Sequence, residues 1–185
     1  MNDIDGNHLD ALIRQAQQGD EAAFEQLLNS CYDSMFRYAM KWCGNRANAE
    51  DITHQACLKL ARGIQQFRFE SAFSSWLYRL VINCAKDWQK TNQRFEHEPL
   101  DNASDNPAPE SNPDSEIHLQ QVLRQVDAIG EGYRETVVLV FGEGLSHREA
   151  GEILKVSEST ISWRIHEIRK RLNPQGKSPQ REGGH

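Results

Sequence analysis

Apolar residues in the first half of the chain recur every three or four positions, which is the spacing of one face of an α-helix. These stripes cover four stretches, residues 9–16, 24–39, 49–62 and 76–94. Gly19 ends the first stripe, Asp20 is suited to cap the helix that follows, and Gly44 ends the second stripe. No stretch alternates polar and apolar residues in the manner of a β-strand. The pattern therefore predicts an all-α domain over residues 9–94.

A segment of different composition interrupts the helical pattern. Prolines and acidic residues dominate residues 96–115, where Leu100 is the only large apolar residue. Such a segment buries too little apolar surface to offset the entropy lost on ordering, so a flexible acidic linker is predicted over residues 95–116. Helical spacing then returns. The predicted fold class is all-α, with two small helical domains at 9–94 and 117–173 and disordered tails at 1–8 and 174–185.

The most informative segment of the second domain is residues 144–172, which have the pattern of a helix-turn-helix. Ser146 followed by Glu149 predicts a capping box at the first helix, and Ser157 is suited to cap the second. The second helix of such a pair lies in the DNA major groove. A plain helical hairpin with a solvated basic face is the alternative, but the two caps and the net charge of +3 over residues 160–172 favour DNA binding. The residues expected to face DNA are Ser159, Thr160, Ser162, Trp163, Arg164, His166, Arg169 and Lys170.

An aromatic and basic segment in the first domain suggests a second kind of DNA contact. Residues 67–79 carry five aromatic and three charged side chains. Aromatic rings can stack on unpaired bases while arginines hold the backbone of a single strand. The alternative is that Trp76, Leu77 and Leu80 simply belong to the hydrophobic core, and Trp76 is expected to be mostly core. The polar side continues along the next helix through Asn83, Lys86 and Lys90.

The net charge of −6 does not exclude a DNA-binding protein, because the excess of acidic over basic residues lies in residues 1–8 and 95–123. Residues 95–123 hold seven acidic side chains and no basic one. The four cysteines form no CxxC pair and lie at no metal-ligand spacing from a histidine, so neither a metal nor a cofactor is expected. They are predicted to pack as small apolar side chains. No apolar run is long enough to span a bilayer and no secretory signal is present, which predicts a cytoplasmic protein without membrane insertion.

Several segments, in the order in which they occur, together resemble one protein family. They are residues 16–24 (AQQGDEAAF), 49–52 (AEDI), 67–68 (FR), 71–80 (SAFSSWLYRL), Asn83 and 144–154 (GLSHREAGEIL). The chain resembles a bacterial RNA polymerase sigma factor of the extracytoplasmic-function type, a two-domain member of the sigma-70 family. The resemblance extends over residues 9–94 and 119–172, and it implies a protein that acts by binding and is not an enzyme.

The resemblance implies a role for each domain. The first domain, sigma region 2, would bind the clamp helices of the largest subunit of core RNA polymerase through Glu50, Asp51, His54, Gln55 and Leu58. It would also melt promoter DNA and capture an unpaired base of the −10 element, with the implied residues Arg68, Phe69, Glu70, Ser71, Ala72, Phe73, Arg79, Asn83 and Lys86. The second domain, sigma region 4, would recognise the −35 element with the helix over residues 157–172. The linker would pass near the RNA exit path of the polymerase, and an anti-sigma factor is a common partner in the family.

One departure from the family pattern affects the polymerase-facing helix. Asp51 is usually followed four residues later by a glutamate, and that position holds Gln55 here. This face has therefore lost a negative charge toward a basic partner, because residues i and i+4 share one side of a helix. One interpretation is harmless variation. The other is weak core binding until a Ser/Thr kinase adds charge, as in a subgroup of the family, with Thr53 as the candidate for phosphorylation. An ordinary structural threonine is favoured, since two positions along a helix lie about 200° apart.

Trp163 is a second departure, because a smaller or polar residue is usual at its position in the family. An indole there has two interpretations, contact with a thymine methyl group or packing on the preceding helix. The sequence does not separate them.

Two rival functions remain to be compared with a sigma factor. The first is a helix-turn-helix transcriptional regulator without polymerase contact, which would leave the aromatic segment and the helix with Glu50 and Asp51 unused. The second is a nuclease or base-modifying enzyme, but no zinc-ligand cluster, glycine-rich phosphate loop or activated nucleophile supports it. The sequence favours a sigma factor that works by binding.

Overall fold

The structure, a computed structural model, describes residues 6–95 and 113–172. Within these ranges every regular element is helical, which confirms the predicted all-α class. The chain divides into two compact units, with the boundary between Gln120 and Gln121. None of the described helices has both the length and the apolar character needed to cross a bilayer.

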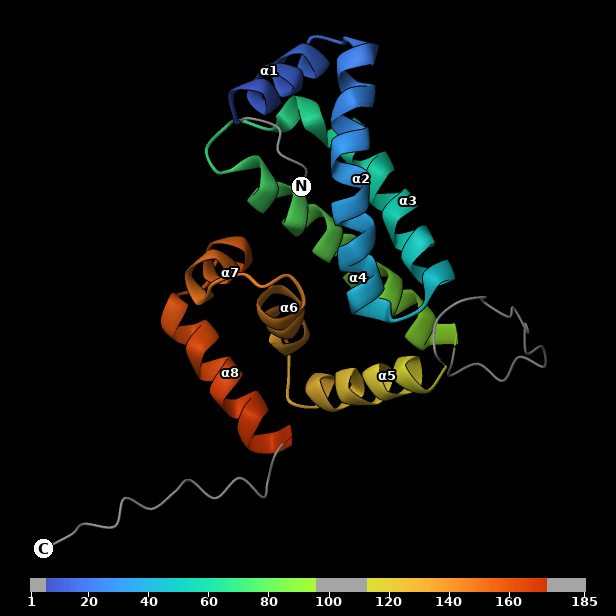
Figure 1. Cartoon of the computed structure of the whole chain (residues 1–185), viewed down its shortest axis with the longest axis vertical. Helices are drawn as coiled ribbons and strands as arrows, with labels where there is room; N and C mark the ends of the chain where they lie inside the picture. Colours follow the sequence, from blue (N-terminus) through green and yellow to red (C-terminus); the bar gives the residue numbers. More distant parts are fainter. Residues whose placement is uncertain (1–5, 96–112, 173–185) are drawn as a thin grey trace, which may run out of the picture. The chain divides into compact units, whose positions relative to one another are not determined.

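Unit 1 is built around one long helix. Its elements are α1 (Gly6–Gln17), α2 (Glu21–Cys43), α3 (Arg46–Gly63), the 3₁₀ turn η1 (Ile64–Gln66) and α4 (Phe73–Phe95). Helix α2 packs against α1, α3 and α4, and α3 also packs against α4 (Figure 1). The apolar stripes of the sequence supply this core, whose largest wholly buried side chains include Ile13, Leu27, Met35, Tyr38, Trp42, Ile52 and Leu60.

Polar caps set the ends of the helices in unit 1. Asp20 accepts a hydrogen bond from the Ala23 N–H at 3.0 Å, and Gly44 ends α2 with a left-handed φ of 64°. Asn45 accepts a hydrogen bond from the Asn48 N–H at 3.1 Å, so α3 begins at Arg46. This start lies three residues before the apolar stripe at 49–62, because a cap satisfies the first N–H groups ahead of the first buried residue.

Helix α4 also begins earlier than predicted, at Phe73 in place of Trp76. The carbonyl of Ala72 accepts a hydrogen bond from the Trp76 N–H at 3.2 Å. Phe73 is buried, so its side chain draws the first turn of α4 into the core of unit 1. The loop between η1 and α4 is correspondingly shorter than the sequence suggested.

All four cysteines are free thiols of unit 1. Cys31, Cys43 and Cys84 are buried and Cys57 is half-buried, which confirms that they pack as small apolar side chains. Burial raises the pKa of the Cys31, Cys57 and Cys84 thiols above the ordinary value, because the thiolate loses its hydration.

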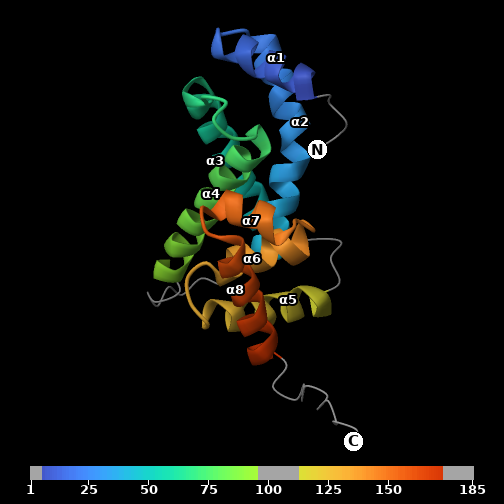
Figure 2. The ribbon, with the colours of Figure 1, turned by 90° about the vertical axis from the view of Figure 1, so that its left-hand side faces the viewer.

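Unit 2 is a cluster of short helices. Its elements are α5 (Pro113–Asp127), which spans the unit boundary, α6 (Tyr133–Val137), the π-helical turn η2 (Val138–Gly142), α7 (His147–Leu154) and α8 (Glu158–Leu172). Helix α8 packs against α6 and α7 (Figure 2). The buried apolar side chains include Leu123, Val126, Val138, Leu139, Ile153, Ile161, Ile165 and Ile168.

Two predicted boundaries are corrected. Helix α5 begins at Pro113, inside the predicted linker, and proline is well suited to the first position of a helix. Helix α1 begins at Gly6, inside the predicted N-terminal tail, because the turn that precedes buried Leu9 is already helical. The remaining linker residues 96–112 and the predicted tail at 174–185 lie outside the described residues.

The two caps predicted in unit 2 are present. The Ser146 hydroxyl oxygen accepts a hydrogen bond from the Glu149 N–H at 3.2 Å, and the Glu149 carboxylate accepts one from the Ser146 N–H at 2.8 Å. Hydrogen bonds from the hydroxyl and the backbone of Ser146 hold the pKa of Glu149 below its ordinary value. At the start of α8, the Ser157 hydroxyl oxygen accepts a hydrogen bond from the Thr160 N–H at 3.1 Å.

A buried ion pair closes the turn between α5 and α6. The Arg134 guanidinium donates to both carboxylate oxygens of Asp127, with 2.7 Å between Nε and Oδ1. Arg134 is buried, and Gly132 in the turn has a left-handed φ of 84°. A bidentate pair of this kind fixes the direction in which α6 leaves the turn.

Replacing Arg134 with alanine should destabilise unit 2 by about 3 kcal/mol, because the Asp127 carboxylate would lose a bidentate partner in a partly buried position. Urea unfolding of the full chain, followed by circular dichroism, measures this loss. The control is Arg148→Ala, since the ion pair of Arg148 with Glu152 is exposed and 3.8 Å long. That variant should lose less than about 0.5 kcal/mol. Equal losses in the two variants would contradict the structural role of the Arg134 pair.

Candidate functional site

One face of α3 gathers all five residues that the family resemblance assigns to polymerase binding. They are exposed, and their spacing places them on the same side of the helix: Glu50, Asp51, His54, Gln55 and Leu58. The opposite side is buried in unit 1 and consists of Ala49, Ile52, Thr53, Ala56 and Leu60. The exposed face thus combines two acids, two neutral polar side chains and one leucine that is 40% exposed.

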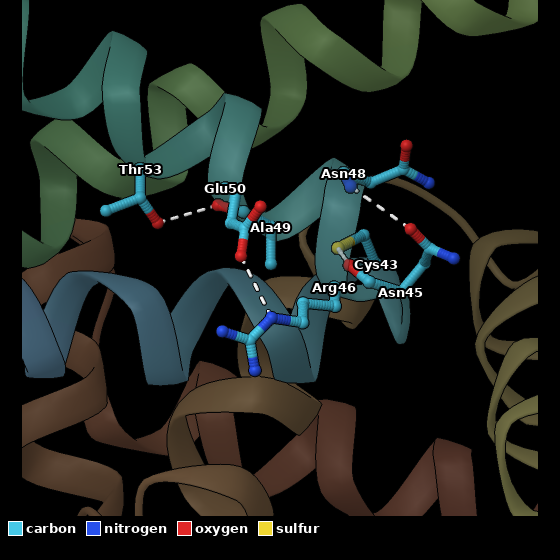
Figure 3. A network of polar contacts seen from close by, with 7 residues as sticks. All are labelled: Cys43, Asn45, Arg46, Asn48, Ala49, Glu50 and Thr53. Atoms are coloured by element: carbon cyan, nitrogen blue, oxygen red, sulfur yellow. Dashed lines mark hydrogen bonds and ion pairs between the residues drawn. The ribbon is translucent and has the colours of Figure 1, made fainter. Parts of the chain in front are cut away.

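Arg46 lies beside this face, in the first turn of α3. Its Nε donates to Oε1 of Glu50 at 2.9 Å, as Figure 3 shows. The guanidinium carbon also lies 5.8 Å from the centre of the Phe36 ring on α2. The side chains of Arg46 and Glu50 are 67% and 50% exposed. We did not predict this pair, although the i, i+4 spacing of the two residues would have indicated it.

Thr53 points away from the exposed face of α3. Its side chain is 0% exposed, and its hydroxyl donates to the carbonyl oxygen of Ala49 at 2.7 Å (Figure 3). A kinase needs an accessible hydroxyl, and a phosphate of nearly two negative charges has no place in a packed core. The hypothesis that phosphorylation of Thr53 restores the charge missing at Gln55 is therefore wrong for the folded protein.

The aromatic segment of unit 1 packs largely on itself. The Phe67 ring centre lies 4.8 Å from that of Phe69, 5.4 Å from that of Phe73 and 5.6 Å from that of Trp76. Phe67 and Phe73 are buried and Phe69 is half-buried. Of the residues named in the core alternative, Leu77 is buried and Trp76 and Leu80 are half-buried. Phe67 and Phe73 also belong to the core, and an enclosed ring offers no free face to a base. Phe73 therefore supports the loop, and its burial is unfavourable to direct stacking on a base.

Helix α1 holds this loop in place. The Gln17 side-chain amide donates to the carbonyl oxygens of Ile64 at 2.9 Å and Phe67 at 2.7 Å. The Arg14 guanidinium carbon lies 4.1 Å from the centre of the Phe69 ring, and Phe69 has a left-handed φ of 58°. Sequence reasoning missed these contacts, since residues about fifty positions apart make them.

The exposed part of the loop is polar and continues onto α4. Arg68, Glu70, Ser71 and Ala72 are exposed in the loop. On α4, Arg79, Asn83 and Lys86 follow one another at helical spacing on one side. The Arg79 guanidinium donates to the Ser71 hydroxyl oxygen at 2.9 Å and so joins the loop to the helix. Six polar residues predicted for the −10 element thus lie in this loop or on one side of α4, namely Arg68, Glu70, Ser71, Arg79, Asn83 and Lys86. Ala72 is exposed among them, Phe69 is half-buried and Phe73 is buried.

Helix α8 presents a polar and basic face on the side opposite its core. Six predicted DNA-contacting residues lie on it and are exposed, namely Ser159, Ser162, Trp163, His166, Arg169 and Lys170. Thr160 is half-buried beside the cap of the helix, where its hydroxyl lies 2.8 Å from that of Ser157. Nδ1 of His147 on α7 lies 2.9 Å from the Ser162 hydroxyl oxygen, so α7 also orients this face.

Arg164 does not join the exposed face of α8. Its guanidinium donates to the carbonyl oxygen of Gly132 at 3.2 Å and to the Thr136 hydroxyl oxygen at 3.4 Å, and it lies over the Tyr133 ring. These contacts tie α8 to the start of α6. Arg164 therefore helps to pack α8 against α6 within unit 2. This corrects its assignment to the residues that face DNA.

Trp163 remains on the surface of α8. Its side chain is 56% exposed, and its ring centre lies 6.1 Å from that of Tyr133. The indole therefore contacts α6 through Tyr133, while much of it stays accessible. The ring contact found is with Tyr133 of α6, and contact of the exposed part with a thymine methyl group stays a prediction.

These features define a two-unit helical protein with exposed polar faces and no clustered chemistry of the kind a metal centre needs within the described residues. The family model described as ECF sigma factor matches residues 7–178. The chain belongs to this family and is a sigma factor, a protein that directs transcription initiation by RNA polymerase.

Individual relatives agree with the family assignment. The ECF RNA polymerase sigma factor SigE of Mycolicibacterium smegmatis is 32% identical over 165 residues, which are 83% of this chain and 63% of that protein. The corresponding factor SigW of Bacillus subtilis is 28% identical, and the match covers 88% of this chain and 94% of SigW. The chain thus spans somewhat less than two thirds of SigE and nearly all of SigW.

Solved structures share the fold. The structure of CnrH in complex with the cytosolic domain of CnrY matches with a TM-score of 0.64 and 21% identity, and covers 89% of this chain and 94% of that chain. The sigma factor RpoE of Bartonella quintana, crystallised with the anti-sigma factor NepR, matches with a TM-score of 0.59 and 20% identity over 82% of this chain and 94% of that chain.

Replacing Gln17 with leucine should loosen the loop that follows η1, because the Ile64 and Phe67 carbonyls would lose their donor. A loss of about 1 kcal/mol corresponds to a roughly fivefold increase in local opening. Amide hydrogen exchange over residues 64–72 measures it. Gln18→Leu, at an exposed neighbouring position, is the matched control and should leave exchange unchanged. Exchange rates that are the same in the two variants would argue against the anchor.

Proposed function

We propose that the chain attaches to core RNA polymerase through the exposed face of α3 and holds promoter DNA at two places. The loop over residues 68–72 with α4 would contact the −10 element, and α8 would contact the −35 element. The observation that carries the proposal is the α3 face, because a helix-turn-helix regulator without polymerase contact would leave it unused. Two linked contacts raise each other's effective concentration, so each contact alone can be modest.

The charges of the α3 face support binding to a basic partner. Glu50 and Asp51 supply carboxylates, and Leu58 adds apolar surface at the end of the same face. Charged groups at the rim of an interface mainly steer association, whereas desolvated apolar side chains add affinity. The clamp helices of the largest polymerase subunit are the proposed partner of this surface.

The proposed −10 contact combines a short polar loop with a helix. Arg68 and Lys86 carry positive charge toward a DNA backbone, and Asn83 offers an amide that can both donate and accept hydrogen bonds. The buried rings of Phe67 and Phe73 hold the loop, so that it can receive an unpaired base without first becoming ordered. Single-stranded DNA is the expected ligand of this surface.

The proposed −35 contact uses the exposed face of α8. Ser159, Ser162 and His166 lie where a recognition helix contacts base edges, and Arg169 and Lys170 lie where its later turns meet phosphates. Trp163 is accessible in the middle of this face. Arg164 holds α8 against α6 and so sets the direction in which the other side chains project.

An anti-sigma factor is a further proposed partner, and the cytoplasm, where polymerase and promoter DNA meet, is the proposed location. The RpoE structure that shares this fold contains the anti-sigma factor NepR, and the CnrH structure contains the cytosolic domain of CnrY. A protein that covered the faces of α3 and α8 would block both polymerase and DNA. Control by a Ser/Thr kinase acting on Thr53 is not proposed.

Replacing Asp51 with asparagine should weaken binding to core polymerase about three- to fivefold at low salt, because an exposed carboxylate contributes up to about 1 kcal/mol to a charged interface. The measurement is the dissociation constant of the full chain for core polymerase, together with run-off transcription from a promoter template. Asp10→Asn, at an exposed position of α1, removes the same charge elsewhere and is the control. A native chain that binds promoter DNA but never core polymerase would favour the rival regulator.

Replacing Lys170 with glutamine should weaken promoter binding by the polymerase complex and reduce the slope of log affinity against log salt by about one, as expected for one lost phosphate contact. Titration of labelled promoter DNA at several salt concentrations gives the slope. Arg124→Gln, at an exposed position of α5, is the control with the same charge change. An unchanged slope for the Lys170 variant would remove this residue from the proposed DNA face.

A further inference from the structure

The position of Arg46 is unfavourable for the helix that contains it. Arg46 is the first residue of α3, and the first turn contains no acidic residue. The N-terminus of a helix carries partial positive charge, so a cation there is repelled by the macrodipole. The arginine also precedes its glutamate in the sequence, and this is the weaker order for an i, i+4 pair. Helix stability therefore gives no reason for an arginine at this position.

Contacts with neighbouring side chains keep the guanidinium at the edge of the polymerase-facing surface. Arg46 holds Glu50 at 2.9 Å and lies over Phe36 (Figure 3 shows the Glu50 contact). The Phe36 ring is itself stacked on Tyr32, with an angle of 3° between the ring planes. Arg46 is thus tethered from two sides, by the carboxylate on its own helix and by the ring on α2.

This tether changes the charge that a partner meets. Glu50 is engaged by Arg46, and the position four residues after Asp51 holds neutral Gln55. Of the two acidic residues on the described face of α3, Glu50 is thus in an ion pair and Asp51 is not. A basic partner must draw Glu50 away from Arg46, and it must also approach the positive charge of Arg46 itself.

We propose that Arg46 sets the strength of attachment to core polymerase, by competing within the chain for the Glu50 carboxylate. The inference rests on the proposed binding of polymerase by the α3 face and adds to it a residue that limits affinity. In the bound state Glu50 turns to a basic side chain of the polymerase, and Arg46 remains on the Phe36 ring. The chain therefore binds more weakly than its acidic residues alone would allow.

The experiment measures the dissociation constant of the full chain for core polymerase without DNA, for the native chain, Arg46→Gln, Glu50→Gln and the double variant. Arg46→Gln should bind about three- to tenfold more tightly at low salt, and the gain should shrink as salt screens the charges. In the Glu50→Gln background the same change should give less than a roughly twofold gain, because the carboxylate for which Arg46 competes is absent. Arg46→Lys should stay close to the native chain, since it keeps the positive charge.

Two controls separate this competition from general effects. Arg148→Gln breaks another exposed i, i+4 pair with the same change in net charge and should leave the dissociation constant unchanged. Thermal unfolding should show Arg46→Gln to be at least as stable as the native chain, because an unfavourable charge leaves the helix N-terminus.

The outcomes distinguish a failure of the role proposed for Arg46 from a failure of the proposed binding to core polymerase. If the native chain binds core polymerase and Arg46→Gln binds equally or less tightly, the role of Arg46 is overturned while the proposed function stands. A gain of equal size in the Glu50→Gln background would also overturn it, because the effect would then not pass through Glu50. If neither chain binds core polymerase, the proposed function itself fails.

Discussion

The packing of α3 on α2 is the constraint on which the functional surface of unit 1 depends. Ala49, Ile52, Ala56 and Leu60 are wholly buried on the side of α3 that packs into unit 1, where α3 contacts α2 and α4. Turning α3 about its axis would expose these aliphatic side chains at a cost of roughly 1.5–3 kcal/mol each. The rotation of the helix is therefore fixed, and with it the set of side chains that a partner can reach.

The same constraint acts in unit 2, where Ile161, Ile165 and Ile168 are buried and fix the rotation of α8. The three buried isoleucines determine which side chains of α8 project outward. They also explain why Arg164, which directly precedes Ile165, is directed toward α6. Apolar residues thus determine which polar residues are available for binding. Arg164 then adds to the constraint, because its hydrogen bond to Gly132 joins α8 to the start of α6.

Features that depend on neighbours in sequence could be predicted, and features that depend on tertiary contacts could not. The caps at Asp20 and Ser146 and the shared face of Glu50 and Asp51 follow from local spacing, which a helix preserves. The burial of Thr53 agrees with the favoured interpretation of an ordinary structural threonine, and the carbonyl four residues earlier satisfies its hydroxyl inside the core. The Arg134–Asp127 pair depends on the turn at Gly132, and no periodic pattern of residues signals such a turn.

Burial also decides where affinity can be adjusted without loss of the fold. A change at Thr53 acts on a packed position, so its effect on binding could not be separated from an effect on unfolding. The pair of Arg46 and Glu50 lies at the rim, where both side chains are largely exposed and their interaction is weak. A weak ion pair allows affinity to be adjusted, because a Glu50 carboxylate that Arg46 held by several kcal/mol would not be available to the polymerase. In the proposed complex, the charge missing at Gln55 and the competition for Glu50 act in the same direction. Both would give an α3 face that binds polymerase moderately and depends on a second contact through DNA.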